Sequence, residues 1–419
     1  AVGAGLALGF LGMSALVPLV ATPLAAVLGW PFAALRGVPG RLGRRNAMRH
    51  PRRTASTAAA LMIGLTLVTT IAVFARSVQA STDAALQQGL HAGVVVTPQG
   101  TSALSASVTG RLAALPQLRT VAGLESENVR IELPAGAGAG GSRTAGATGT
   151  EVAAYARDVS VTPAAGRLAA VGGATVAVTT GVADAWHLHV GSALPLGSTE
   201  VARHRFSVAA VIHDPTGLTG DVLFSTAGLA LLFPDATPPL HVVLARQAPG
   251  VGQAAALAAA DRALAGEPQA QVRTKAQFIA DANRQFQQMV SLVTALLGLA
   301  VVIALFGIVN TLALSVVERR REIGLLRALG LSRRQLRAAV RWEAVVVALL
   351  GTVLGIVLGL AFGWAVVDAL RSQGVDRFAV PFGELVAFVV LAAVAGVAAA
   401  VLPARSAARV DVLAAVTTE

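Results

Sequence analysis

The sequence predicts an α-helical membrane protein: a transmembrane bundle of about five helices with an inserted α/β extracytoplasmic domain. Hydrophobic residues make up 55% of the 419 residues and charged residues only 13%, whereas a soluble domain carries roughly 25% charged residues. The mean hydropathy is +0.68, and a long polar segment separates the apolar stretches. This composition excludes a disordered chain and disfavours an ordinary cytosolic enzyme.

Five apolar stretches qualify as membrane-spanning helices, which need about 20 residues each. All five are rich in Ala, Val, Leu and Gly. They cover residues 1–28, 55–74, 289–317, 344–367 and 385–402. The chain opens at Ala1 inside the first stretch, as expected of a fragment or a processed form.

Arginine-rich connections predict the orientation of these helices. Residues 36–53 contain seven arginines and no acidic residue, and residues 318–341 contain eight arginines against two glutamates. Basic connections stay in the cytoplasm, so both segments and the C-terminal tail are expected there, where they are compatible with contact to anionic lipid. Residues 77–285 are then expected outside the membrane.

The net charge of +11 follows this topology and does not indicate nucleic-acid binding. The outer segment, residues 77–285, contains 13 basic and 14 acidic residues, so the excess positive charge lies in the cytoplasmic segments. There is no Cys, which excludes a disulfide framework and any Cys-ligated metal site.

These observations predict a series of ten segments. In order, they are a linker transmembrane helix (1–30), a cytoplasmic Arg-rich segment (31–54), a transmembrane helix (55–76), the extracytoplasmic domain with helical stalks (77–285), a transmembrane helix (286–317), a cytoplasmic coupling segment (318–342), a transmembrane helix (343–368), a short external loop (369–383), a transmembrane helix (384–403) and a cytoplasmic tail (404–419).

The outer segment has the pattern of an α/β domain. A helix is predicted over residues 102–115, a flexible Gly/Ala/Ser/Thr-rich loop over 135–149, and a helical pattern over 252–288 with an interruption at 266–268. Short strands are predicted over residues 94–97, 129–133, 175–179, 206–212, 222–225 and 241–245.

No catalytic or metal-binding residue is predicted in the outer segment. His187 and His189 would share one face of a strand and reach a common metal, but no metal-binding signature accompanies them, so surface or turn histidines are the better interpretation. Residues 213–217 have the composition of a turn.

Residues 306–363 are the most informative stretch of the sequence. Gly330 is placed to end an Arg/Glu-rich helix that starts at Glu318, and Ser332 to cap a second short helix over residues 333–341. Such basic helices serve either as a membrane-edge anchor or as a docking surface for a cytoplasmic partner. Further along, four glycines spaced by four residues form a smooth face for close packing of another helix; they are Gly351, Gly355, Gly359 and Gly363.

The run from Asn310 to Gly330, NTLALSVVERRREIGLLRALG, resembles the signature of FtsX-like permeases of ABC transporters, the MacB/LolC/LolE group. Residues 45–55 and 402–409 resemble further parts of the same family, and the resemblance covers about 40% of the chain. It implies four helices with the extracytoplasmic domain between the first and the second. The helix at 1–28 is then extra, and the chain resembles the C-terminal half of a duplicated ten-helix permease.

The resemblance also implies that ATP and Mg are bound by a cytoplasmic ABC ATPase subunit of the MacB/LolD/FtsE type. No cofactor site and no enzymatic activity are expected in this chain, because a P-loop is absent and its only lysine, Lys275, precedes Ala276. The ATPase-coupling residues are expected to be Glu318, Arg321, Glu322, Ile323, Gly324, Arg327, Leu329, Gly330, Ser332 and Arg333. Other expected partners are a second permease half or subunit, membrane lipid and an extracytoplasmic substrate or protein, but not nucleic acid.

Two functions remain open from the sequence. The first is a permease subunit of the cell membrane that exports or extracts a lipid, lipoprotein, peptide or antibiotic. The second is a non-transporting module that passes movement to an extracellular cell-wall hydrolase. The 209-residue outer segment favours the first, because a signalling domain needs less chain.

Overall fold

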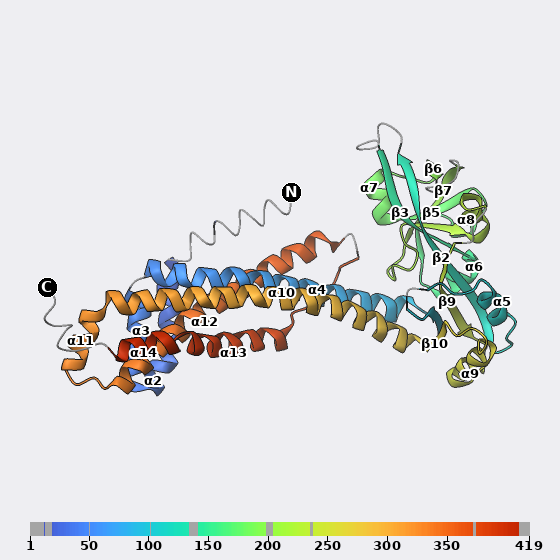
Figure 1. The fold of residues 1–419 in the computed structure, drawn as a ribbon. Helices are drawn as coiled ribbons and strands as arrows, with labels where there is room; N and C mark the ends of the chain where they lie inside the picture. The colour runs from blue at the N-terminus through green and yellow to red at the C-terminus, as the bar shows by residue number, and fades with distance from the viewer. Residues whose placement is uncertain are drawn as a thin grey trace. The chain divides into compact units, whose positions relative to one another are not determined.

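The computed structural model divides into two compact units (Figure 1). The helical unit comprises residues 1–80, 287–371 and 375–419, and the α/β unit comprises residues 81–286 and 372–374. The structure describes residues 12, 19–49, 51–100, 102–133, 141–197, 204–234, 238–371 and 374–409.

Eight labelled helices contribute residues to the helical unit, and two of them, α4 and α10, also extend into the α/β unit. They are α2 (Trp30–Leu35), α3 (Gly37–Arg49), α4 (Pro51–Gly89), α10 (Lys275–Glu318), α11 (Arg320–Ala328), α12 (Arg333–Ala369), α13 (Phe382–Ala399) and α14 (Val401–Ala408).

Three helical segments of the described chain are long and apolar enough to cross a membrane: Thr54–Gly89, Arg333–Ala369 and Phe382–Ala408. Two shorter apolar helices, Leu19–Leu35 and Leu305–Glu318, accompany them. Most of the predicted span at 1–28 lies outside the described residues. The count of five spanning helices therefore stays a prediction.

The separate short helix predicted over residues 333–341 is wrong. Residues 333–369 form one continuous helix, α12. No Gly or Pro occurs between Arg333 and Leu350 to interrupt the backbone hydrogen bonds, so the basic turns run directly into the apolar ones.

The predicted glycine face of α12 lies against α4. At each glycine an added Cβ would meet atoms of one turn of α4, and the contacted residues advance along α4 in step, from Ala58 through Leu65 and Thr69 to Val73. At Gly355, for example, the Cβ would lie 2.9 Å from Cβ of Leu65 and 3.0 Å from the carbonyl oxygen of Met62. Only glycine permits this approach of the two backbones.

The α/β unit is built on a ten-stranded sheet. Its main path runs β10-β1-β9-β2-β3-β8-β5-β7-β4, and β6 pairs with β2 and β7. The β3–β8 and β5–β7 pairs are parallel, and the others are antiparallel. The strands are β1 (Val94–Pro98), β2 (Leu118–Leu133), β3 (Gly141–Thr150), β4 (Thr162–Gly166), β5 (Thr175–Thr179), β6 (Ala193–Gly197), β7 (His204–His213), β8 (Val222–Ser225), β9 (Leu240–Gln247) and β10 (Ala270–Thr274).

Short helices pack on this sheet and close its apolar cores. They are α5 (Ser107–Ala113), α6 (Val152–Asp158), α7 (Thr180–Trp186), α8 (Thr226–Leu232), α9 (Gln253–Ala263) and the 3-10 turn η1 (Leu168–Ala170). In the largest core, Phe206 and Phe224 meet edge to face with ring centroids 5.3 Å apart, and Trp186 of α7 belongs to the same cluster.

The six predicted strands are confirmed, and most of them extend beyond their predicted ends. The predicted helix at 102–115 forms only over Ser107–Ala113, because Leu104 pairs with Leu240 as an isolated β-bridge.

The interruption predicted at 266–268 is present, but the residues after it form β10, which pairs with β1, before α10 begins. Helix-forming residues such as Ala270 and Gln271 are thus held in a strand by tertiary pairing.

The flexible loop predicted over residues 135–149 is wrong from residue 141 onward, where β3 forms; residues 135–140 lie outside the described chain. β3 has few large side chains because neighbouring elements pack close to its backbone. A Cβ at Gly149 would lie 2.9 Å from Cβ of Leu229 in α8, and Ala145 and Ala147 are buried. Small residues therefore indicate close contact here and not flexibility.

The turn predicted at 213–217 is confirmed, and Asp214 organises it. The Asp214 carboxylate accepts hydrogen bonds from the backbone N–H groups of Thr216 and Thr219, each at 2.8 Å, and from the Tyr155 hydroxyl at 3.2 Å. Tyr155 is fully buried. This carboxylate thus ties the turn to α6 and has a structural role.

Lys275, the first residue of α10, contacts the end of α4 within the α/β unit. Its Nζ donates hydrogen bonds to the carbonyl oxygens of Gln87 at 2.7 Å and Leu90 at 2.5 Å. The charge thus satisfies terminal carbonyls and lies at the negative end of the helix dipole.

Leucine at both Gly355 and Gly359 should weaken the packing of α12 on α4. Overpacking typically costs about 1–3 kcal/mol per site, so the unfolding temperature of the purified protein in detergent should fall by several degrees. Gly307→Leu on α10 is the matched control, since an added Cβ there meets no atom within 4 Å. Equal unfolding temperatures for the double variant and the control would contradict this packing.

Asp158 should make the α/β unit less stable as the pH rises. Its side chain is fully buried, and although Thr120 and Arg246 contact it, burial dominates and raises the pKa of the Asp158 carboxyl above 3.8. The folded state therefore binds the Asp158 proton more tightly than the unfolded state does. As a result, the free energy of unfolding falls as the pH rises from about 3.8 through the raised pKa of the folded state. The unfolding temperature of Asp158→Asn, relative to the native protein, should increase between pH 4 and pH 7. If the difference in unfolding temperature between Asp158→Asn and the native protein were the same at pH 4 and pH 7, the raised pKa of Asp158 would be refuted.

Candidate functional site

α11 is a nine-residue helix between α10 and α12, with one face turned inward and one outward. Ile323 and Gly324 are buried, whereas the side chains of Leu325 and Leu329 are 57% and 77% exposed. Two apolar residues four positions apart on an exposed stripe lack a partner within the described chain. Burying them against another protein would stabilise the assembly through the hydrophobic effect.

The C-terminal end of α11 is fixed by its own sequence. Gly330 has φ +100°; its N–H donates to the carbonyl oxygen of Arg327, and the N–H of Leu331 donates to that of Leu326, both at 3.0 Å. This is a Schellman motif, which requires a left-handed residue and therefore favours glycine.

The next helix begins immediately. The Ser332 hydroxyl accepts from the backbone N–H of Gln335 at 3.2 Å, and the Gln335 side chain accepts from the backbone N–H of Ser332 at 2.9 Å, forming a capping box. Only residues 329–332 connect α11 to α12, and each is held by a hydrogen bond.

The inner face of α11 packs in an apolar cluster with neighbouring helices. Ile323 meets residues of α10, α12 and α14, among them Val316, Leu336 and Ala404. Leu331 packs against the same cluster, which places the residue after the helix end in contact with the core.

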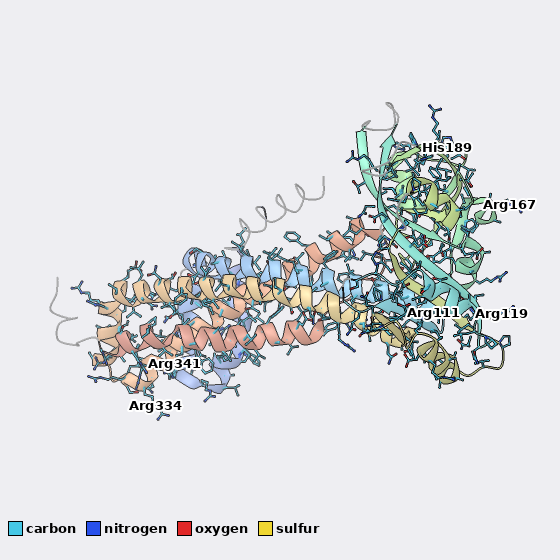
Figure 2. The ribbon with its side chains drawn as sticks, turned by 45° about the vertical axis from the view of Figure 1, so that its right-hand side comes forward. Arg111, Arg119, Arg167, His189, Arg334 and Arg341 are labelled. Carbon is cyan, nitrogen blue, oxygen red and sulfur yellow. The ribbon has the colours of Figure 1, made fainter. Side chains whose placement is uncertain are left out.

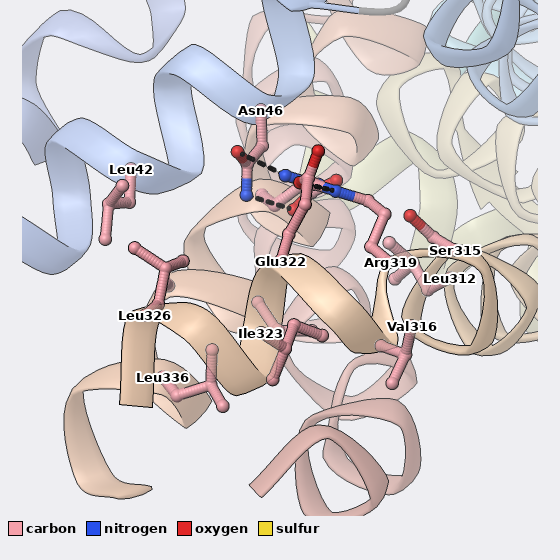
Figure 3. A pocket seen from close by; sticks show the side chains of 13 residues that line it. Leu42, Asn46, Leu312, Ser315, Val316, Arg319, Glu322, Ile323, Leu326 and Leu336 are labelled. Carbon is pink, nitrogen blue, oxygen red and sulfur yellow. Dashed lines mark hydrogen bonds and ion pairs between the residues drawn. The ribbon is translucent and has the colours of Figure 1, made fainter. Parts of the chain in front are cut away.

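The N-terminal side of α11 is held by a polar network that joins α3, α11 and α12 through Arg319, the residue between α10 and α11 (Figure 3). Arg319 donates to Glu322 at 2.9 Å and to the Asn46 side-chain oxygen at 3.1 Å. Asn46 in turn donates to Glu343 at 3.1 Å, and Arg49 reaches Glu322 at 3.5 Å. The side chain of Arg319 is only 18% exposed, so these partners compensate its burial.

A small cavity of about 50 Å³ lies at this network, lined by residues of α3, α10, α11 and α12 (Figure 3). Small-molecule sites usually measure roughly 300–1,000 Å³, so this cavity is too small for a nucleotide or a drug-sized substrate. It has room for water, and its polar lining, including Asn46 and Glu343, provides hydrogen-bonding partners. The arrangement is that of a joint between helices.

The structure separates the predicted coupling residues into two groups. One group is exposed and consists of Glu318, Arg321, Leu329, Gly330, Ser332 and Arg333. Glu322 is also exposed, but its carboxylate belongs to the network with Arg319 and Arg49. Ile323 and Gly324 face the core, and Arg327 is half-buried. The four α12 glycines lie outside this site, along the contact with α4.

Sequence reasoning missed Asn46, Arg319, Glu343 and Leu325. Leu325 had a signal, because it stands four residues before Leu329 in a run of arginines. Asn46 had none, since its partners lie 273 and 297 residues away.

His187 and His189 follow α7 in a turn and not on a strand, in line with their interpretation as turn histidines; His187 ends α7 with φ +53°. In the described chain, no group of three His, Cys, Asp or Glu side chains is placed to hold a metal.

Two family profiles match the chain. Residues 54–263, half of its length, match the MacB-like periplasmic core domain, and residues 294–412 match the FtsX-like permease C-terminal family.

Curated relatives match over shorter stretches. The macrolide export ATP-binding/permease protein MacB of Bordetella avium is 37% identical over 120 residues, which are 29% of this chain and 18% of that protein. The pyoverdine export ATP-binding/permease protein PvdT of Pseudomonas syringae is 29% identical over 226 residues, 51% of this chain and 33% of that protein. The chain thus spans about a fifth to a third of the length of these relatives.

Among solved structures, the periplasmic region of MacB from Actinobacillus actinomycetemcomitans aligns at 12% identity with a TM-score of 0.38, covering 46% of this chain and 94% of that one. The extracellular domain of the ABC-type transporter YknZ from Gram-positive bacteria aligns at 9% identity with a TM-score of 0.33, covering 43% and 99%.

Asn46→Leu should destabilise the helical unit. The variant leaves Arg319 and Glu343 each without one hydrogen-bond partner in a partly buried site, which costs about 1–3 kcal/mol. The unfolding temperature in detergent should fall accordingly. Asn310→Leu is the matched control, because that side chain is exposed on α10. A fall of equal size in both variants would show that the network contributes nothing.

Proposed function

Since the chain belongs to the FtsX-like, MacB-type permease family, we propose that it is the membrane-spanning subunit of an ABC transporter and that α11 receives the movement of a cytoplasmic ATPase. The observation that carries this proposal is the outward stripe of α11, where Leu325 and Leu329 are exposed beside Arg321. The three residues are spaced by four and share one helix face.

The ATPase is proposed to bind this stripe from the cytoplasm. Apolar anchors surrounded by basic residues suit a partner with an apolar groove and an acidic rim. ATP and Mg would be bound by that partner, because this chain has no P-loop.

Movement of α11 would pass to the two long helices that flank it. Only Arg319 separates α10 from α11, and only residues 329–332 separate α11 from α12. Arg319 also connects α11 to α3 through Asn46. A displacement of α11 would therefore also displace α10 and α12. Because α10 contains residues of both units, the displacement would reach the α/β unit through this helix.

Export is the proposed outcome of this movement. The relatives are named as exporters of macrolides and of pyoverdine, so an amphipathic small molecule, peptide or lipid is the proposed class of substrate. The α/β unit would bind it outside the membrane, and both arginine-rich segments and the C-terminus would face the cytoplasm. The relatives do not favour the alternative, activation of a cell-wall hydrolase.

Aspartate at both Leu325 and Leu329 should abolish binding of the ATPase. Carboxylates at the apolar anchors would have to lose their hydration in an apolar groove and would face the acidic rim of the partner, so the ATPase should no longer co-purify with the full-length protein, and substrate should no longer stimulate ATP hydrolysis. Glu322→Arg and Gly330→Leu should also lower the stimulation, the first by breaking the pairs with Arg319 and Arg49 and the second by straining the end of α11.

Val190→Asp/Leu231→Asp is the control for this experiment, because both side chains are exposed in the α/β unit to a similar degree, 42% and 41%. It should retain the ATPase. Full stimulation in the α11 variants, with normal insertion in the membrane, would sink the proposed docking site.

A further inference from the structure

α3 turns one stripe of its surface away from the bundle. Gly40, Gly43 and Ala47 are buried, whereas Val38, Arg41 and Arg45 are exposed. At about 100° per residue, the exposed stripe lies opposite the buried one. α3 therefore has a fixed inner face and a fixed outer face.

Close backbone contact with α12 prevents α3 from rotating. A Cβ at Gly43 would lie 2.9 Å from Cβ of Trp342 and 3.0 Å from the carbonyl oxygen of Ala339. Any side chain at this position would displace the helix. The direction of Arg41 and Arg45 is thus set by packing on the other side of α3.

Among the arginines of residues 36–49, Arg41 and Arg45 are the two for which the described part of the chain provides no partner. Arg44 donates to the carbonyl oxygen of Ala26 at 2.9 Å, Arg49 pairs with Glu322, and Arg36 lies over the Trp342 ring at 5.7 Å. Neither Arg41 nor Arg45 forms an ion pair or hydrogen bond in the described part of the chain. No acidic residue occurs anywhere between residues 19 and 53, so their counter-charge must come from outside this segment.

Exposed apolar residues precede these two charges. Trp30 and Leu35 of α2 are 64% and 80% exposed, and Val38 at the start of α3 is 48% exposed. Gly37 between them has φ +59°, which lets α2 fold back on α3 at a tight turn. Trp and Leu beside unpaired arginines is the combination found in helices that lie at the headgroup level of a membrane.

We propose that α2 and the outer stripe of α3 form a binding surface for anionic phospholipid, in which Arg41 and Arg45 contact the headgroup phosphates and Trp30 and Leu35 enter the acyl boundary. Phospholipid fits better than a soluble anion, because a free phosphate would leave the apolar residues in water. The surface requires neither the ATPase nor α11, so it goes beyond the proposed transport function.

Fluorescence quenching tests this surface in the full-length protein. The chain has four tryptophans, and replacing Trp186, Trp342 and Trp364 with Phe leaves Trp30 as the only reporter. The variant is placed in nanodiscs that contain either brominated phosphatidylglycerol in a phosphatidylcholine background or brominated phosphatidylcholine at the same fraction. Brominated phosphatidylglycerol should quench Trp30 several-fold more strongly.

Arg41→Gln/Arg45→Gln should bring the quenching by the two lipids close to equality, since each basic residue near an anionic surface contributes a severalfold factor in affinity. Arg334→Gln/Arg341→Gln changes the net charge equally on exposed positions of α12 (Figure 2) and should keep the preference.

Three results would overturn the proposal. Equal quenching by both lipids would mean a generic membrane contact, and equal losses in the two double variants would mean an effect of net charge alone. No quenching by either lipid would mean that the surface faces away from the membrane, as a protein-docking surface would.

Discussion

The backbone contact between α4 and α12 is the constraint on which the helical unit depends. Four glycines remove every side chain from one stripe of α12, and α4 fills the space turn by turn. Because the stripe is continuous, it fixes both the separation and the rotation of α12. α3 then packs on α12 through Gly43, so the position of the amphipathic segment before α4 follows from the same contact.

The two ends of α11 are held in different ways. Its C-terminal end is specified locally by Gly330 and Ser332, whose hydrogen bonds all join residues within five positions. Its N-terminal end depends on Arg319 and Asn46, which meet only after the chain has folded. The shape of α11 is thus set locally at its C-terminal end, whereas its attachment to the bundle depends on contacts that form only in the folded chain.

Local features of the sequence were predictable, and long-range pairings were not. The Gly330 and Ser332 caps, the glycine face and the strands at 175–179 and 222–225 each follow from short patterns with a physical cause. β3 and β10 were missed because small or helix-forming residues occupy them, and only their neighbours, such as Leu229 and β1, explain that choice. The partners of Asn46 were missed for the same reason, since no local pattern indicates a contact across nearly 300 residues.

The length of the connection between α11 and α12, residues 329–332, also sets the rotation of one helix about its axis relative to the other. The glycine stripe fixes the rotation of α12, and Ile323 with Arg319 fixes that of α11, while every residue from Leu329 to Ser332 is committed to a cap. An α-helix turns by about 100° per residue, so one inserted residue would put Gly324 where Ile323 now packs and would turn Leu325 into the buried position that Gly324 now holds. Most surface loops accept changes in length at little cost. In this joint a change in length would rotate α11 against α12, so the number of residues between the two helices decides which side chains of α11 face outward.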